Sequence, residues 1–134
     1  MRDETIRRVL TTTRRIALVG ASDKPNRASH EVMVYLLGKG YEVTPVNPLL
    51  AGKEIWGRKV VASLAEAAPL EMVDLFRRAE EVSAPVDEAI ALGARSIWMQ
   101  LGIVNEAVAA KARAAGLEVV MDACPAIEIP RLGL

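Results

Sequence analysis

Five short apolar runs alternate with helical patterns along this chain, and this alternation restricts the possible folds more than any other feature of the sequence. The runs occupy residues 14–20, 42–47, 72–76, 96–100 and 118–122. They are almost continuously apolar, which is typical of strands that are covered on both faces. Strands that alternate with helices in this way form a parallel sheet with right-handed crossovers and helices on its faces.

Between the runs, apolar residues recur at the spacing of a helix. The residues that mark these helices are Ile6, Val9, Leu10, Met33, Leu36, Leu37, Val82, Val86, Ile90, Val104 and Val108. Predicted N-caps are Ser29, Ser83 and Asn105. The segment 49–70 is the least regular, with a turn predicted at 56–58 and a short helix at 63–67.

The predicted fold is a Rossmann-like three-layer α/β fold with a five-stranded parallel sheet, in a single domain over residues 1–134. Numbered along the chain, the five strands are expected to lie in the order 3-2-1-4-5. In this order the ligand crevice opens beyond the carboxyl ends of the first and fourth strands, where the strand order reverses.

The composition argues against several classes of function. Lysine and arginine together equal aspartate and glutamate, so the net charge is zero and a broad basic face for nucleic acid is not expected. No apolar run approaches the roughly 20 residues of a membrane-spanning helix, and we expect no signal peptide. With one cysteine, the chain has neither an internal disulfide nor a cysteine zinc site. We therefore expect a cytoplasmic protein.

The turn after the first strand has the features of an anion site. Gly20 allows the backbone to turn tightly, and the helix that follows offers free N–H groups and a partial positive charge at its N-terminus. Lys24 and Arg27 add two cations to this loop. The dinucleotide fingerprint G-x-G-x-x-G is not met, because Ser22 and Pro25 stand at the second and third glycine positions.

The second strand ends without an acidic residue. NAD-binding domains have Asp or Glu there to accept hydrogen bonds from the ribose, but this chain has Asn47 and Pro48. Because a carboxylate would repel a phosphate on the ribose, its absence, together with Lys24 and Arg27, favours a ligand with a phosphorylated ribose. Coenzyme A carries a 3′-phosphate and NADP a 2′-phosphate, and this pattern alone leaves both open.

A resemblance to a known family covers almost the whole chain. Its motifs are Gly20-Ala21-Ser22 with Pro25, Arg27 and Ser29, then Val46-Asn47-Pro48, residues 73–78 (VDLFRR), residues 98–102 (WMQLG) and residues 124–128 (CPAIE). With this spacing the chain resembles the small CoA-binding proteins, which are similar to the CoA-binding domain of the succinyl-CoA synthetase α subunit. The resemblance implies that CoA, or an acyl-CoA, lies across the carboxyl edge of the sheet.

The resemblance also implies which residues contact the cofactor. The loop after the first strand would use its backbone, a hydroxyl and its cations, the end of the second strand would flank the adenosine, and the third and fourth strand ends would border the site. The residues concerned are Gly20, Ala21, Ser22, Lys24, Pro25, Arg27, Ser29, Asn47, Pro48, Phe76, Arg77, Arg78 and Gln100. Arg77 and Arg78 are equally well explained as surface charges at the end of a strand.

No catalytic or metal-binding set of residues stands out in the sequence. The synthetase subunit has a second domain with a phosphorylated histidine; here the only histidine, His30, is expected to be a solvated or capping residue. Cys124 is expected to be a buried packing residue, with a mixed disulfide to the CoA thiol as the alternative. The predicted function is therefore a stand-alone module that binds CoA without catalysis. The alternatives are a small NADP-dependent oxidoreductase or redox sensor, and a regulatory subunit of a CoA-using enzyme, so a protein partner or a homo-oligomer stays open.

Overall fold

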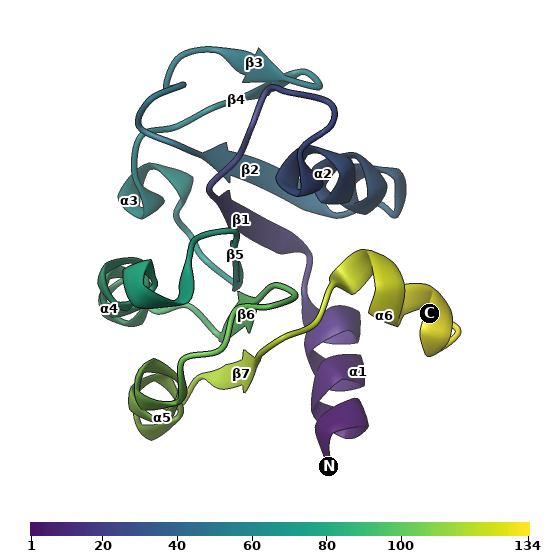
Figure 1. Ribbon diagram of the computed structural model, residues 1–134, viewed down its shortest axis with the longest axis vertical. Coiled ribbons are helices and arrows are strands. Elements are labelled where there is room, and N and C mark those ends of the chain that lie inside the picture. The colour runs from purple at the N-terminus through teal and green to yellow at the C-terminus, as the bar shows by residue number, and fades with distance from the viewer.

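A computed structural model, which describes all of residues 1–134, confirms the α/β architecture (Figure 1). The strands of the five-stranded parallel sheet are β1 (Arg15–Val19), β2 (Glu42–Val46), β5 (Met72–Leu75), β6 (Ser96–Met99) and β7 (Glu118–Val120). A separate antiparallel pair consists of β3 (Glu54–Ile55) and β4 (Arg58–Lys59). The helices are α1 (Arg2–Thr12), α2 (Ala28–Gly38), α3 (Leu64–Ala67), α4 (Ser83–Ala91), α5 (Glu106–Ala114) and α6 (Pro125–Arg131), with a 3-10 turn at Ala79–Glu81.

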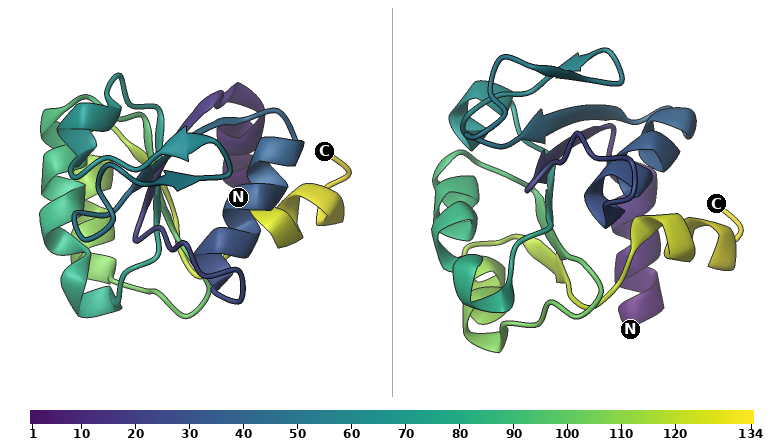
Figure 2. Two further views of the ribbon diagram at one scale, coloured as in Figure 1. Left: turned by 90° about the horizontal axis from the view of Figure 1, so that it is seen from above. Right: turned by 45° about the horizontal axis from the view of Figure 1, so that its top comes forward.

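The sheet separates two apolar cores. Helices α1, α2 and α6 cover one face and α3, α4 and α5 cover the other (Figures 1 and 2). Successive side chains of a strand point to opposite faces. Trp98 therefore packs in the core under α1, α2 and α6, and its neighbour Met99 packs in the core under α3, α4 and α5. Both are fully buried. The continuous apolar character of the strands is therefore explained by their packing on both faces.

The order of the strands is β2-β1-β5-β6-β7, which corrects the place predicted for residues 72–76. The prediction puts this segment beyond β2, but β5 pairs with β1 on the opposite side. The place beyond β2 is taken by Val61, which forms a parallel bridge: its N–H donates to the carbonyl of Pro45 at 3.0 Å, and its carbonyl accepts from the N–H of Asn47 at 2.9 Å. With this bridge counted as the third strand, the order along the sheet is 3-2-1-4-5-6, and β5 is the fourth strand.

Pro45 explains why β2 has only a short bridge on its outer side. Proline has no N–H to donate, so it is tolerated in edge strands and disfavoured where a full ladder of hydrogen bonds must form. By contrast, all four residues of β5 are buried, as in a central strand. Pro45 is thus the signal in the sequence that distinguishes the edge of this sheet from its centre.

The helix starts confirm one of the three predicted N-caps. Asn105 caps α5, because its Oδ1 accepts from the N–H of Val108 at 3.1 Å. Ser29 and Ser83 lie inside the first turns of α2 and α4 and cap neither helix. The reason is that turns just upstream, including the 3-10 turn before α4, start both helices earlier than their sequence patterns indicate. The predicted short helix is α3, and the predicted turn joins β3 to β4.

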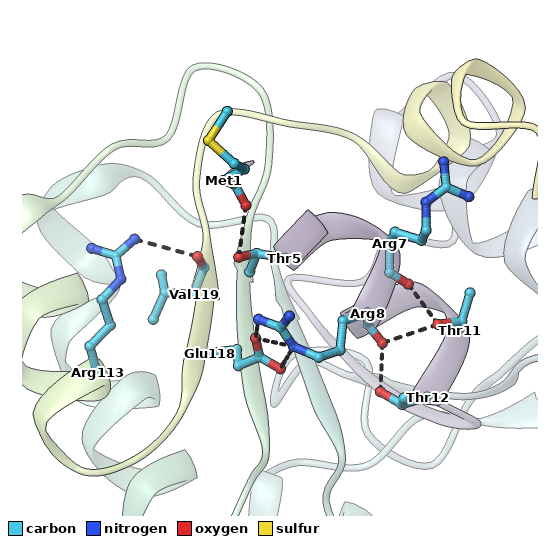
Figure 3. Close-up of polar contacts among 9 residues, drawn as sticks. All are labelled: Met1, Thr5, Arg7, Arg8, Thr11, Thr12, Arg113, Glu118 and Val119. Carbon is cyan, nitrogen blue, oxygen red and sulfur yellow. Dashed lines mark hydrogen bonds and ion pairs between the residues drawn. The ribbon is translucent and has the colours of Figure 1, made fainter. Parts of the chain in front are cut away.

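The outer edge of β7 is covered by side chains from two helices (Figure 3). From α1, the Arg8 Nε donates to the two carboxylate oxygens of Glu118 at 3.1 and 2.9 Å. From α5, Arg113 donates to the carbonyl of Val119 at 3.4 Å. The contact of Arg113 occupies a backbone carbonyl that would otherwise be available to pair with another strand, and the ion pair of Arg8 with Glu118 holds α1 beside this edge.

Candidate ligand site

The candidate site lies at the carboxyl edge of the sheet, between β1 and β5. The chain leaves β1 through α2 to one face and leaves β5 through α4 to the other, and such a divergence is where α/β sheets bind ligands. The groove there has a volume of about 550 Å³. It is lined by Gly20, Ala21, Ser22, Lys24, Arg27, Ala28, Ser29, Asn47, Leu49, Leu50, Phe76 and Arg77, and we call it the cation groove.

Gly20 turns the chain out of β1 at a point where no side chain fits. Its φ is +90°, and a Cβ atom would lie 2.8 Å from the carbonyl oxygen of Phe76. Its N–H donates to the carbonyl of Val46 at 3.0 Å, which ties the turn to the end of β2. The close approach of this loop to the end of β5 therefore requires glycine.

The loop between β1 and α2 is held by its own hydrogen bonds. The hydroxyl of Ser22 accepts from the N–H of Lys24 at 3.1 Å, and the N–H of Arg27 donates to the carbonyl of Lys24 at 3.0 Å. Pro25 occupies the second position of the turn formed by residues 24–27, where its fixed φ is favourable. Pro25 does not line the groove, so its contribution is to shape the loop that carries the two cations.

Asn47 connects the end of β2 to this loop. Its Nδ2 donates to the carbonyl of Ala21 at 2.8 Å, and its Oδ1 accepts from the N–H of Leu49 at 2.9 Å. Both ends of the amide are thus bonded within the chain, so Asn47 fixes the wall of the groove. Its neighbour Pro48 lies outside the cation groove and lines a separate cavity.

Three cations line the cation groove without an ion pair of their own. These are Lys24, Arg27 and Arg77. Arg78 differs, because its Nε lies 3.8 Å from a carboxylate oxygen of Glu80 and 3.2 Å from one of Glu81, and it does not line the groove. Of the two adjacent arginines, the structure brings only Arg77 to the candidate site.

The N-terminus of α2 adds to the positive potential of the cation groove. Its N-cap residue, Arg27, makes no side-chain hydrogen bond to the helix, and the N–H groups of Ala28 and Ser29 have no partner within the chain and are free for a ligand. Ser29 lies in this first turn, lines the groove and is buried. A helix start with free N–H groups beside unpaired cations favours an anion such as phosphate.

A second groove of about 510 Å³ adjoins the cation groove, and we call it the apolar groove. The two grooves share Ala28 and Phe76 in their walls. The other residues of the apolar groove are Glu31, Val32, Tyr35, Gln100, Leu101, Ile103, Cys124, Ala126 and Ile127. Gln100 lies here, and not in the cation groove, because β6 is separated from β1 by β5. Together the grooves suit a ligand with a phosphate end and an extended arm.

Asp74 lies buried beside the apolar groove and is absent from the sequence-based site. It is fully buried, and with the Gln100 amide oriented for hydrogen bonding, Gln100 Nε2 donates to Asp74 Oδ1 at 2.8 Å and to Oδ2 at 3.3 Å. Burial raises the pKa of Asp74 well above its ordinary value, because no cation offsets the loss of solvation. The signal in the sequence is the only acidic residue within the otherwise apolar β5.

Replacing Asp74 with asparagine is expected to raise the free energy of unfolding at neutral pH and to leave it nearly unchanged in strong acid. The folded pKa lies above the unfolded value of about 3.9, so the native state binds more protons than the unfolded state between the two values. The wild type therefore loses stability as pH rises through this interval, and Asp74→Asn does not. Urea unfolding at a series of pH values measures the difference; a constant difference between the two proteins would contradict it.

His30 and Cys124 are both buried. His30 is 9% exposed and lines neither groove, which corrects the expectation of a solvated or capping residue: it lies inside α2 on the side that is buried. Cys124 is 7% exposed and lines the apolar groove. The structure contains no group of three or more His, Cys, Asp or Glu side chains that could hold a metal ion. None of its helices has both the length and the apolar character needed to cross a membrane.

Known proteins match this chain over nearly its full length. A family model described as a CoA binding domain matches residues 14–130. The protein YneT of Bacillus subtilis (strain 168) is 39% identical over 120 residues, which are 89% of this chain and 87% of that protein. The structure of a protein from Pyrococcus horikoshii OT3 superposes with a TM-score of 0.92 at 42% identity and covers 100% of this chain and 94% of that one.

The same fold occurs as part of a larger enzyme. A structure of the dinucleotide-forming acetyl-coenzyme A synthetase 1 of Ca. Korarchaeum cryptofilum matches with a TM-score of 0.71 at 21% identity. The match covers 83% of this chain but only 26% of the synthetase. At this level of identity the likeness shows a shared fold.

Proposed function

This chain belongs to the family of CoA-binding domains, and we propose that it binds coenzyme A across the two grooves at the carboxyl edge of its sheet. The observation that carries the proposal is the junction of the grooves: one lined by unpaired cations, the other mostly apolar, with Ala28 and Phe76 in the wall of both. Coenzyme A has the same division, with phosphates on the nucleotide and a long pantetheine arm.

The phosphorylated nucleotide occupies the cation groove in this proposal. Lys24, Arg27 and Arg77 bind its phosphates, because charge-assisted hydrogen bonds to phosphate are the strongest that side chains offer. The free N–H groups at the start of α2 contribute further donors, and Gly20 lets the backbone come close. Asn47 and Pro25 act indirectly, by holding the loops in place. Arg78 and Pro48 are left out of the proposed contacts, since neither lines the groove.

The pantetheine arm occupies the apolar groove. This assignment favours CoA over NADP, although both carry a phosphate on the adenosine ribose. The nicotinamide half of NADP has a second ribose and a carboxamide, and these polar groups would lose hydrogen bonds to water without finding partners on a mainly apolar wall. The arm of CoA is narrower and less polar, with two amide groups separated by methylene carbons.

The role that we propose is binding without catalysis. The side chains that line the cation groove are cations, two serines, an asparagine and apolar residues, with no His, Cys, Asp or Glu among them to act as a general base. In this role the protein is a stand-alone cytoplasmic module that carries or presents CoA, or an acyl-CoA, to other proteins.

Thermal unfolding with different nucleotides tests the proposed function. At equal concentration, CoA is expected to raise the Tm more than dephospho-CoA, NADP or NAD does. A ligand that binds only the native state stabilises it by about 2.7 kcal/mol at a hundredfold excess over Kd, which corresponds to a Tm increase on the order of 10 °C for a chain of this length. A larger increase with NADP than with CoA, or no increase with CoA, would overturn the proposal.

A further inference from the structure

Gln100 brings a buried amide to the wall of the apolar groove. Its side chain lines the groove although the residue is only 6% exposed. Its backbone is fixed on both sides, because its N–H donates to the carbonyl of Leu75 at 3.4 Å and its carbonyl accepts from the N–H of Ile103 at 2.9 Å. Only the side chain of Gln100 can still rotate, and a half-turn of its amide group would exchange the positions of the oxygen and the nitrogen.

Asp74 removes this freedom. Its carboxylate accepts from Gln100 Nε2 at 2.8 Å (Oδ1) and 3.3 Å (Oδ2), so the amide nitrogen faces the buried carboxyl. In this orientation the amide oxygen and the second N–H are directed away from Asp74 and stay available for other partners. Asp74 is fully buried and does not line either groove, so its effect on a ligand passes through Gln100.

We propose that Asp74 is a positioning residue for the ligand arm: it fixes the amide of Gln100 so that this amide bonds an amide of pantetheine in the apolar groove. The proposal rests on the proposed function, since it requires that the arm of CoA lies in this groove. An amide placed against an apolar wall must find a hydrogen-bond partner, because burying it without one is unfavourable. An oriented Gln100 supplies that partner.

The surroundings of Asp74 support a role of this kind. It stands in β5 opposite Leu18 of β1 and Trp98 of β6, both fully buried. Burial raises the pKa of its carboxyl, because the charged form loses solvation and no cation offsets that loss. The polar contact that this buried carboxyl makes is its hydrogen bond with the amide of Gln100.

The test compares CoA with adenosine 3′-phosphate 5′-diphosphate, which is CoA without its pantetheine arm. Gln100→Leu and Asp74→Leu are each expected to weaken CoA binding about tenfold, the usual effect of leaving one buried polar group without its partner. Binding of the nucleotide without the arm is expected to be unchanged. The double variant is expected to lose no more than either single variant, because both remove the same interaction. Calorimetric titration measures all Kd values.

Asp74→Asn is the conservative control. Its amide oxygen can still accept from Gln100 Nε2, so CoA affinity is expected to stay within about twofold of wild type. If Asp74→Leu does not fold, Asp74→Ala takes its place. The proposal fails if an Asp74 variant without a polar side chain keeps full CoA affinity, or if it weakens both ligands equally. Failure of the wild type to bind CoA would instead overturn the proposed function itself.

Discussion

Replacing Arg27 with glutamate is expected to weaken CoA binding by about a hundredfold while the fold remains intact. Arg27 is exposed, lines the cation groove and has no ion pair within the chain. Losing one charge-assisted hydrogen bond costs about 1.5–3 kcal/mol, and the reversed charge adds repulsion of the phosphate. Calorimetric titration with CoA and with dephospho-CoA measures the loss. If Arg27 meets the 3′-phosphate, the loss is much smaller for dephospho-CoA.

Arg78→Glu is the matched control for Arg27→Glu, because it makes the same change of charge nearby but outside the groove. Arg78 is exposed and pairs with Glu80 and Glu81, so its effect on CoA reaches the ligand only through screened long-range attraction. We expect a change in Kd of no more than about threefold. Equal losses in both variants would mean that the general field of the protein, and not a contact of Arg27, binds the phosphate. Equal losses for both ligands in Arg27→Glu would place this residue at the pyrophosphate.

Replacing Gly20 with alanine is expected to lower the free energy of unfolding by about 3 kcal/mol, since positive-φ strain and a steric clash each cost about 1–3 kcal/mol. The added Cβ would lie 2.8 Å from the carbonyl oxygen of Phe76, which is backbone and cannot rotate away. The loop must then move away from β5, so CoA affinity is expected to fall as well. Urea unfolding measures the stability, and CoA titration of the folded fraction measures the affinity.

Gly116→Ala is the control that separates the effect of positive-φ strain from that of the steric clash. Gly116 has nearly the same φ, +94°, but nothing lies within 4 Å of its Cβ position, and it stands at the opposite edge of the sheet, before β7. This variant is therefore expected to lose only the strain contribution, about 1 kcal/mol, and to keep CoA affinity. If Gly20→Ala were no less stable than Gly116→Ala, the contact with Phe76 would not explain the glycine.

Local sequence patterns predict most elements of this fold, but they do not predict α6 or the short strands β3 and β4. Continuously apolar runs predict strands buried on both faces, because each strand must supply two cores with alternate side chains. Helical spacing predicts α1, α2, α4 and α5, including the buried residues Ile6, Val9 and Leu10 of α1. Gly20, Lys24 and Arg27 indicate the anion-binding turn, since the properties of a strand–turn–helix connection depend on residues that are adjacent in the chain.

The position of each strand in the sheet was decided by the tertiary structure. Pairing of β5 with β1 joins residues more than fifty positions apart, and periodicity within a segment does not specify such a partner. Pro45, which restricts the outer side of β2, is the one local feature that bears on it. This pairing brings Phe76 and Arg77 next to Gly20 and separates Gln100 from the cation groove by one strand.

The hydrogen-bond partners of the polar side chains were also decided by the tertiary structure. The resemblance assigns Asn47 and Arg78 to the ligand site. Asn47 lines the cation groove with its amide bonded to Ala21 and Leu49, whereas Arg78 pairs with Glu80 and Glu81 outside the groove. Asp74 is an ordinary acid in the sequence and becomes a buried carboxyl beside Gln100 only when β5 and β6 pair. A residue type determines which bonds a side chain can form, whereas the neighbours that the fold brings within reach determine which of those bonds are left for a ligand.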